Sequence, residues 1–160
     1  MKKAITLIFA CLLATMSFAQ ETRPANVDDA NIDKFVNSAF DLADKKAKYS
    51  KMTTAISDTL DKLNAGARVD TAIYNGLDRR AKTLQDNYTK LNSDLETLAN
   101  EGETMVNNAT KIKPVTKIGK ATKNVKSAVT VIADTRKGLV PEAEKATTLR
   151  ARIAKMKALK

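Results

Sequence analysis

Apolar residues recur along most of the chain at alternating steps of three and four residues, the spacing of one face of an α-helix. One such stripe runs from Ile32 to Leu63, and a second, more regular one runs from Tyr74 to Ile112. A β-strand would need strict alternation with period two, which these residues do not show. The pattern therefore predicts helices over about 27–65 and 70–112.

A third stripe follows Pro114, which ends the second helix and suits the first turn of the next one. Pro141 interrupts this stripe, because proline lacks the amide hydrogen that a helix interior needs. We predict a third helix over about 114–158 that is kinked or split at Pro141. Its inward positions are expected to be Val115, Ile118, Thr122, Val125, Val129, Ile132, Arg136 and Leu139, and then Ala146, Leu149, Ile153 and Met156.

Polar residues near the ends of the stripes indicate where the helices start. Asn26, with Asp29 three positions later, has the spacing of an N-cap for the first helix, and Asp70 can cap the second. Within the first stripe, Lys46 occupies an apolar position. Either its stem packs while the ammonium group reaches solvent, or it is a buried functional lysine.

The connections between the predicted helices are short, so neighbouring helices must run antiparallel. The sequence therefore predicts an all-α fold, an elongated antiparallel (up-down-up) three-helix bundle with coiled-coil-like seams. The alternative architecture is a two-helix stalk that forms a homo-oligomer through the same seams.

The first 19 residues have the three-part layout of a secretory signal peptide. Two lysines precede an apolar run of about 13 residues, and small residues then flank Phe18. The run is shorter than the roughly 20 residues that a membrane-spanning helix needs. Lipidation is disfavoured because Cys11 lies in the middle of the run. We expect a bacterial-type signal peptide over 1–19, with cleavage after Ala19.

This signal peptide sets the expected organisation of the rest of the chain. A polar, flexible lead-in is predicted over 20–26, followed by a helical bundle domain over 27–160. Cleavage would leave no transmembrane segment, so we expect a periplasmic or secreted protein.

The composition removes most kinds of catalytic site. The chain has no histidine and its only cysteine is Cys11, so the mature chain lacks imidazole bases, thiolate nucleophiles, His or Cys metal ligands and disulfides. Neither a glycine-rich phosphate loop nor a Ser-x-x-Lys motif occurs. We therefore expect a protein that is not an enzyme and that uses no cofactor or metal.

Basic residues are concentrated in the last third of the chain. Residues 111–160 hold 14 basic and 3 acidic side chains, and the whole chain has a net charge of +10. The chain has no acidic residue between Glu103 and Asp134, where six lysines occur: Lys111, Lys113, Lys117, Lys120, Lys123 and Lys126. One interpretation of this pattern is a surface that binds an anionic partner. The alternative is neutralisation within the bundle by Asp28, Asp29, Asp33, Glu101 and Glu103.

The same region disfavours nucleic acid as the partner. Residues 111–160 contain no aromatic side chain that could stack on bases, and lysines outnumber arginines eleven to three. The expected partner is instead an acidic protein surface, an anionic envelope polymer or lipid headgroups. We expect a non-enzymatic helical interaction or structural protein of the cell envelope whose Lys-rich third helix makes this contact.

The general plan of an export signal and a basic, helical chain of about 160 residues resembles the Skp (OmpH) class of periplasmic holdase chaperones. The resemblance implies, as an alternative function, that the protein holds unfolded exported chains. It covers the plan alone, because residues 20–31 lack the β-branched alternation of the strand that this class has after its signal.

Overall fold

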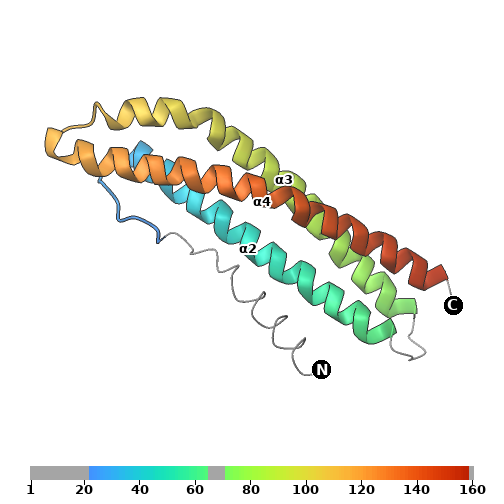
Figure 1. Cartoon of the computed structure of the whole chain (residues 1–160). Coiled ribbons are helices and arrows are strands. Elements are labelled where there is room, and N and C mark those ends of the chain that lie inside the picture. Colours follow the sequence, from blue (N-terminus) through green and yellow to red (C-terminus); the bar gives the residue numbers. More distant parts are fainter. Residues whose placement is uncertain (1–21, 65–70, 159–160) are drawn as a thin grey trace, which may run out of the picture.

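The computed structural model describes residues 22–64 and 71–158; the predicted signal peptide and the predicted cap Asp70 lie outside these ranges. Within them, three long α-helices pack against one another (Figure 1): α2 (Ala30–Asn64), α3 (Thr71–Ala109) and α4 (Ile118–Ala158). A short 3-10 helix, η1 (Val115–Lys117), connects α3 to α4. The described residues form no β-strand, which confirms the prediction of an all-α helical bundle.

Asp29, and not Asn26, caps α2. Its Oδ1 atom accepts hydrogen bonds of 3.1 Å from the backbone amides two and three residues later. Asp33 Oδ1 accepts another, of 2.8 Å, from the amide of Val27. Both carboxylates satisfy amides at the positive end of the helix, where negative charge is favourable. The prediction of Asn26 is wrong because the residue directly before the first helical position makes the cap.

The two prolines of the third predicted helix have different roles. Pro114 directly precedes η1, and its carbonyl oxygen accepts a 2.9 Å hydrogen bond from the amide of Lys117. Beyond η1, α4 continues as one helix to Ala158, with Pro141 inside it. Of the two alternatives predicted for the third helix, the split into two helices is therefore wrong.

One hydrophobic cluster runs along the contact of the three helices. α3 contributes the nearly unbroken apolar stripe that the sequence predicts. Gly102 in this stripe is buried, and a Cβ atom there would lie 3.3 Å from a methyl carbon of Val129 in α4, so the missing side chain allows close approach. The largest fully buried side chains are Tyr74, Tyr88, Ile32, Ile56, Leu60, Leu84, Leu91, Leu95, Ile153, Val27 and Val125.

The buried face of α4 differs from the predicted stripe in its first half. Thr122, Val129 and Arg136 were expected to face inward, but Val129 and Arg136 are exposed and Thr122 is only partly buried. The inward positions one residue earlier are taken instead by Ala121, Ala128 and Thr135. Small side chains on the inner face let helices approach closely, and a pattern of hydrophobicity alone ranks valine above alanine at such positions.

A group of polar side chains interrupts the core; we call it the polar layer, and it consists of Lys46, Ser50, Thr53, Tyr88 and Glu142. The hydroxyl oxygens of Thr53 and Tyr88 lie 3.1 Å apart, and Thr53 also donates to the backbone carbonyl of Tyr49. Because a threonine hydroxyl has one hydrogen, Tyr88 must be the donor to Thr53. The rings of Tyr49 and Tyr88 meet edge to face, with their centroids 5.8 Å apart.

Glu142 of α4 is the acidic member of the polar layer, and its side chain is only 12% exposed. Burial alone would raise the pKa of Glu142, but hydrogen bonds from Lys145 and Ser50 and the charges of Lys145 and Lys46 outweigh it and leave the pKa lowered. The ammonium group of Lys46 lies against α4, where a Cβ atom on Gly138 would be 2.9 Å from its nitrogen. Lys46 thus contributes its charge to the contact between α2 and α4.

Thr53 and Thr122 provide a matched test of buried hydroxyl groups. Thr122 Oγ1 is buried and has no hydrogen-bond partner among the described residues, whereas Thr53 is bonded to two groups. We expect Thr122→Val to raise the free energy of unfolding by about 1 kcal/mol, because an unsatisfied buried hydroxyl is removed. Thr53→Val should lower it by about 1–2 kcal/mol, because Tyr88 loses its acceptor. Urea unfolding measures both changes, and a destabilised Thr122→Val protein would contradict the assignment.

Glu142 predicts a dependence of stability on pH. The pKa of Glu142 is lower in the folded protein than in the unfolded chain, where it is about 4.5. The carboxylate therefore stabilises the fold above that pH, and this contribution is lost as the pH falls through the lower pKa of the folded state. We expect Glu142→Gln to cost about 1 kcal/mol at pH 7 and almost nothing at the acid end. Urea unfolding across this pH range measures the effect. Glu144→Gln, at an exposed glutamate, is the control and should leave the free energy of unfolding unchanged at every pH.

Candidate functional site

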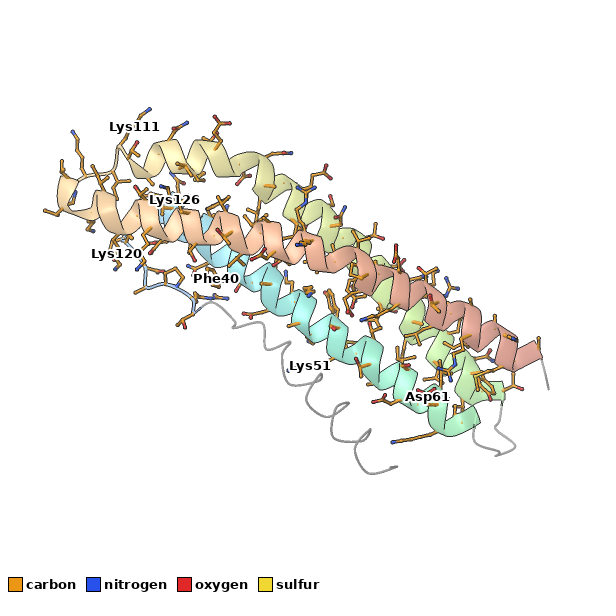
Figure 2. All side chains as sticks on the ribbon, viewed as in Figure 1. Phe40, Lys51, Asp61, Lys111, Lys120 and Lys126 are labelled. Carbon is orange, nitrogen blue, oxygen red and sulfur yellow. The ribbon has the colours of Figure 1, made fainter. Side chains whose placement is uncertain are left out.

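The six lysines of the acid-free segment gather around one end of the bundle, which we call the lysine end. Lys111 and Lys113 lie in the turn that follows α3, Lys117 ends η1, and the other three lie in the first turns of α4. Figure 2 shows Lys111 and Lys120 on opposite sides of this end, with Lys126 further along α4. The lysines therefore surround the end of the bundle and do not form a single row.

Two of these lysines contact the segment that precedes α2, residues 22–29, which we call the N-terminal arm. Lys117 Nζ lies 3.0 Å from Asp28 Oδ2, and Lys120 Nζ donates a 2.7 Å hydrogen bond to the backbone carbonyl of Asn26. The hydrogen bond and the charge of Lys117, with a smaller contribution from the charge of Lys120, lower the pKa of Asp28. Neutralisation within the bundle thus applies to Lys117.

The N-terminal arm has further contacts with the helices. Asn124 of α4 donates a 2.9 Å hydrogen bond to the backbone carbonyl of Ala25. The guanidinium of Arg23 lies 2.6 Å from a carboxylate oxygen of Asp41 and 5.9 Å from the ring centre of Phe40. In the lead-in predicted over 20–26, Arg23, Ala25 and Asn26 contact side chains of α2 and α4; the flexibility of this segment stays a prediction. Two of these bonds are accepted by backbone carbonyls of the arm, those of Ala25 and Asn26, which side-chain patterns do not reveal.

The remaining four lysines of this end, Lys111, Lys113, Lys123 and Lys126, are exposed. None of them has an ion pair within residues 22–64 and 71–158. The acids predicted to neutralise these lysines form no ion pair with them in the described residues. Asp29 and Asp33 accept hydrogen bonds from backbone amides near the start of α2. Glu101 and Glu103 are exposed. Internal neutralisation is therefore partial, and a field of positive charge remains at this end.

Val115 is a feature of the lysine end that sequence reasoning missed. It was expected to face the core, but it is 75% exposed at the start of η1. Its neighbours in the chain, Lys113, Pro114 and Thr116, are exposed as well, whereas Ile112 is buried. The signal in the sequence was Pro114, because a residue directly after a proline in a short connection lies in the turn and not on the helical face.

An open groove of about 710 Å³ lies between α3 and α4, away from the lysine end. Its lining is mostly apolar or hydroxyl-bearing, with Glu144 as its one charged residue: Tyr88, Thr89, Asn92, Leu139, Val140, Ala143, Glu144, Thr147 and Thr148. In the described chain, no three carboxylate, histidine or cysteine side chains gather as metal ligands. The groove thus lacks paired acid and base groups, and the lysine end is the stronger candidate site.

Comparison with other proteins adds no assignment to this geometry. No protein-family model, no curated protein and no solved structure matches the chain. None of the described helices has the length and apolar character needed to cross a membrane. The functional argument therefore rests on the residues of the lysine end.

The pair of Lys117 and Asp28 can be tested by titration. Lys117 stabilises the charged form of Asp28, so we expect Lys117→Gln to raise the pKa of that carboxyl group towards its ordinary value. Lys123→Gln removes the same charge from the same helical region but should leave the pKa unchanged. NMR titration of the Asp28 carboxyl group measures both. An equal response to the two substitutions would mean that a diffuse field, and not the pair, lowers the pKa.

Proposed function

We propose that this protein is a non-enzymatic, exported helical interaction protein of the cell envelope, and that its lysine end contacts an anionic partner or surface. The observation that carries the proposal is the group of four exposed lysines without an acidic partner among the described residues. Like charges held together repel one another, and binding an anion relieves this repulsion. Lysines without interleaved aromatics suit diffuse, salt-dependent attraction and not the reading of a nucleic acid sequence.

We infer further that the body of the protein is an elongated up-down-up rod with coiled-coil-like seams. Polar contacts support this topology: Lys117 pairs with Asp28 near the start of α2, and Arg152 pairs with Asp61 near its end. Lys157, close to the end of α4, bonds to Asn75 in the first turns of α3. A bend at Pro141 is part of the proposal, since proline removes one helical hydrogen bond. A helix of this length spans roughly 60 Å, so one end can reach a partner away from the rest.

Export, with function in the periplasm or outside the cell, is also part of the proposal and rests on the predicted signal peptide. The partner in that compartment is an acidic protein surface, an anionic envelope polymer or lipid headgroups. A homo-oligomer formed through the side of the rod is compatible with this function, because the lysine end would stay free.

The alternative of a holdase chaperone finds less support in the surface of the described residues. A protein that holds unfolded chains needs a large, continuous apolar surface. The four large apolar side chains that are exposed among the described residues are far apart in the chain, one in α3, one in η1 and two in α4: Ile73, Val115, Val129 and Val140. We therefore keep binding of an anionic partner as the proposed function.

Binding to immobilised heparin at increasing salt tests the proposal. We expect the wild-type protein to elute above about 0.3 M salt, because several lysines must be displaced together. A triple substitution of Lys111, Lys123 and Lys126 by Gln should elute at clearly lower salt and show a smaller dependence of affinity on salt concentration.

A matched control removes three other exposed lysines of the same chain, Lys45, Lys48 and Lys51 of α2. Substituting these by Gln changes the net charge by the same amount, yet it should shift elution far less. Equal shifts for the two triple variants would show that net charge alone causes retention. Absence of retention for the wild-type protein would reject the proposed function.

A further inference from the structure

The connection between α3 and α4, at the lysine end, combines positive charge with one exposed apolar side chain. Figure 1 shows the connection between α3 and α4 at one extremity of the bundle. In this connection, residues 113–116 are all exposed, and Val115 is the most exposed of the large hydrophobic side chains described, at 75%. A single exposed valine is common on protein surfaces. Its position at the extremity, between lysines, is what calls for an explanation.

The backbone that presents Val115 is held in place from both sides. Ile112 before it is buried, and Ile118 after it packs against the core cluster. The amide of Lys117 closes the turn by donating to the carbonyl of Pro114 over 2.9 Å. The carbonyl oxygen of Val115 also accepts the backbone amide of Ile118. Val115 is therefore held by its backbone with its side chain largely exposed, and binding through it would cost little ordering of the chain.

The charges around Val115 have the distribution that a flat anionic surface would meet. Lys111 and Lys113 precede it, and Lys120, which bonds to a backbone carbonyl and to no carboxylate, follows it. Positive groups without an acidic partner among the described residues therefore flank the apolar side chain on both sides in the chain. The nearest acid of the arm, Asp28, is paired with Lys117. Lysines carry long apolar stems and can place the ammonium group at the level of lipid phosphates while a short side chain beside them goes deeper.

We propose that this end of the rod docks end-on to an anionic lipid bilayer, with Val115 entering the interfacial region and the surrounding lysines contacting lipid phosphates. This inference rests on the proposed function and names the class of its partner. A bilayer is favoured over a soluble polyanion because a hydrated polysaccharide or polyphosphate offers an exposed valine nothing to pack against, whereas the acyl boundary of a membrane does. Each lysine near such a surface contributes roughly fivefold to binding.

Tryptophan fluorescence offers a direct test, because the chain contains no tryptophan. The protein is purified after export from an expressing bacterium, and its mass establishes whether residues 1–19 are still attached. Val115→Trp places the only indole at the proposed contact, and Val140→Trp places it at another exposed valine, inside α4. Both variants are titrated with vesicles of equimolar phosphatidylglycerol and phosphatidylcholine, and with vesicles of phosphatidylcholine alone.

We expect the emission of Trp in the Val115→Trp protein to shift to shorter wavelength, and to be quenched by brominated acyl chains, with the anionic vesicles only. The Val140→Trp protein should bind to the same vesicles without either change. In a sedimentation assay, Val115→Asn should weaken binding to anionic vesicles about fivefold, because the apolar contact is lost, whereas Val140→Asn should leave it unchanged. Retention of Val115→Asn on heparin should equal that of the wild-type protein.

The other outcomes separate this inference from the proposed function. Binding to anionic vesicles with an indole in the Val115→Trp protein that stays water-exposed would overturn the end-on insertion. Retention on heparin without binding to vesicles would overturn it too, and would point to a soluble polyanion or an acidic protein. If the wild-type protein bound neither heparin nor anionic vesicles, the proposed function as a whole would be rejected.

Discussion

The burial of one apolar face of α3 against both α2 and α4 is the interaction on which the remaining features depend. Most of the stability of such amphipathic helices comes from burial of their apolar faces, and the buried cluster is what keeps the three helices together. Small buried residues, such as Ala81 and Gly102 in α3 and Ala121 and Ala128 in α4, let the helices approach closely at several positions. This packing also fixes the position of the turn after α3 at one end of the bundle.

Charged side chains have different surroundings in the polar layer and at the lysine end. In the polar layer, Glu142 is mostly buried and surrounded by donors and cations, so its charge contributes to the contact between helices. Among the described residues, Lys117 is the one lysine of the lysine end that pairs with a carboxylate, and this carboxylate is largely exposed. Exposed pairs contribute little to stability. The ion pair at this end therefore adds little to the stability of the fold. In the proposed function, the lysines that remain unpaired serve to bind an anionic partner.

Much of the fold could be predicted from the sequence, because a regular stripe of large side chains, as in α3, leaves a helix few alternatives. The details that could not be predicted depend on neighbours that the sequence does not reveal. Ala128 faces inward and Val129 outward because closeness of packing, and not hydrophobicity alone, decides between adjacent residues. The six lysines of the candidate site could be read from the sequence, but the docking of the N-terminal arm on Lys117 and Lys120 could not.

This docking bears on what the lysine end can bind. The arm already satisfies Lys120 with a backbone carbonyl and Lys117 with Asp28, so part of the positive surface is occupied by the chain itself. Asp28 has a positive φ of 59°, a conformation that a residue other than glycine seldom adopts, and its side chain is 81% exposed. An anion that approaches Lys117 therefore competes with a single exposed carboxylate and not with a buried network. Since the arm keeps its other anchors on Asn124 and Asp41, such an exchange can take place without unfolding the start of α2.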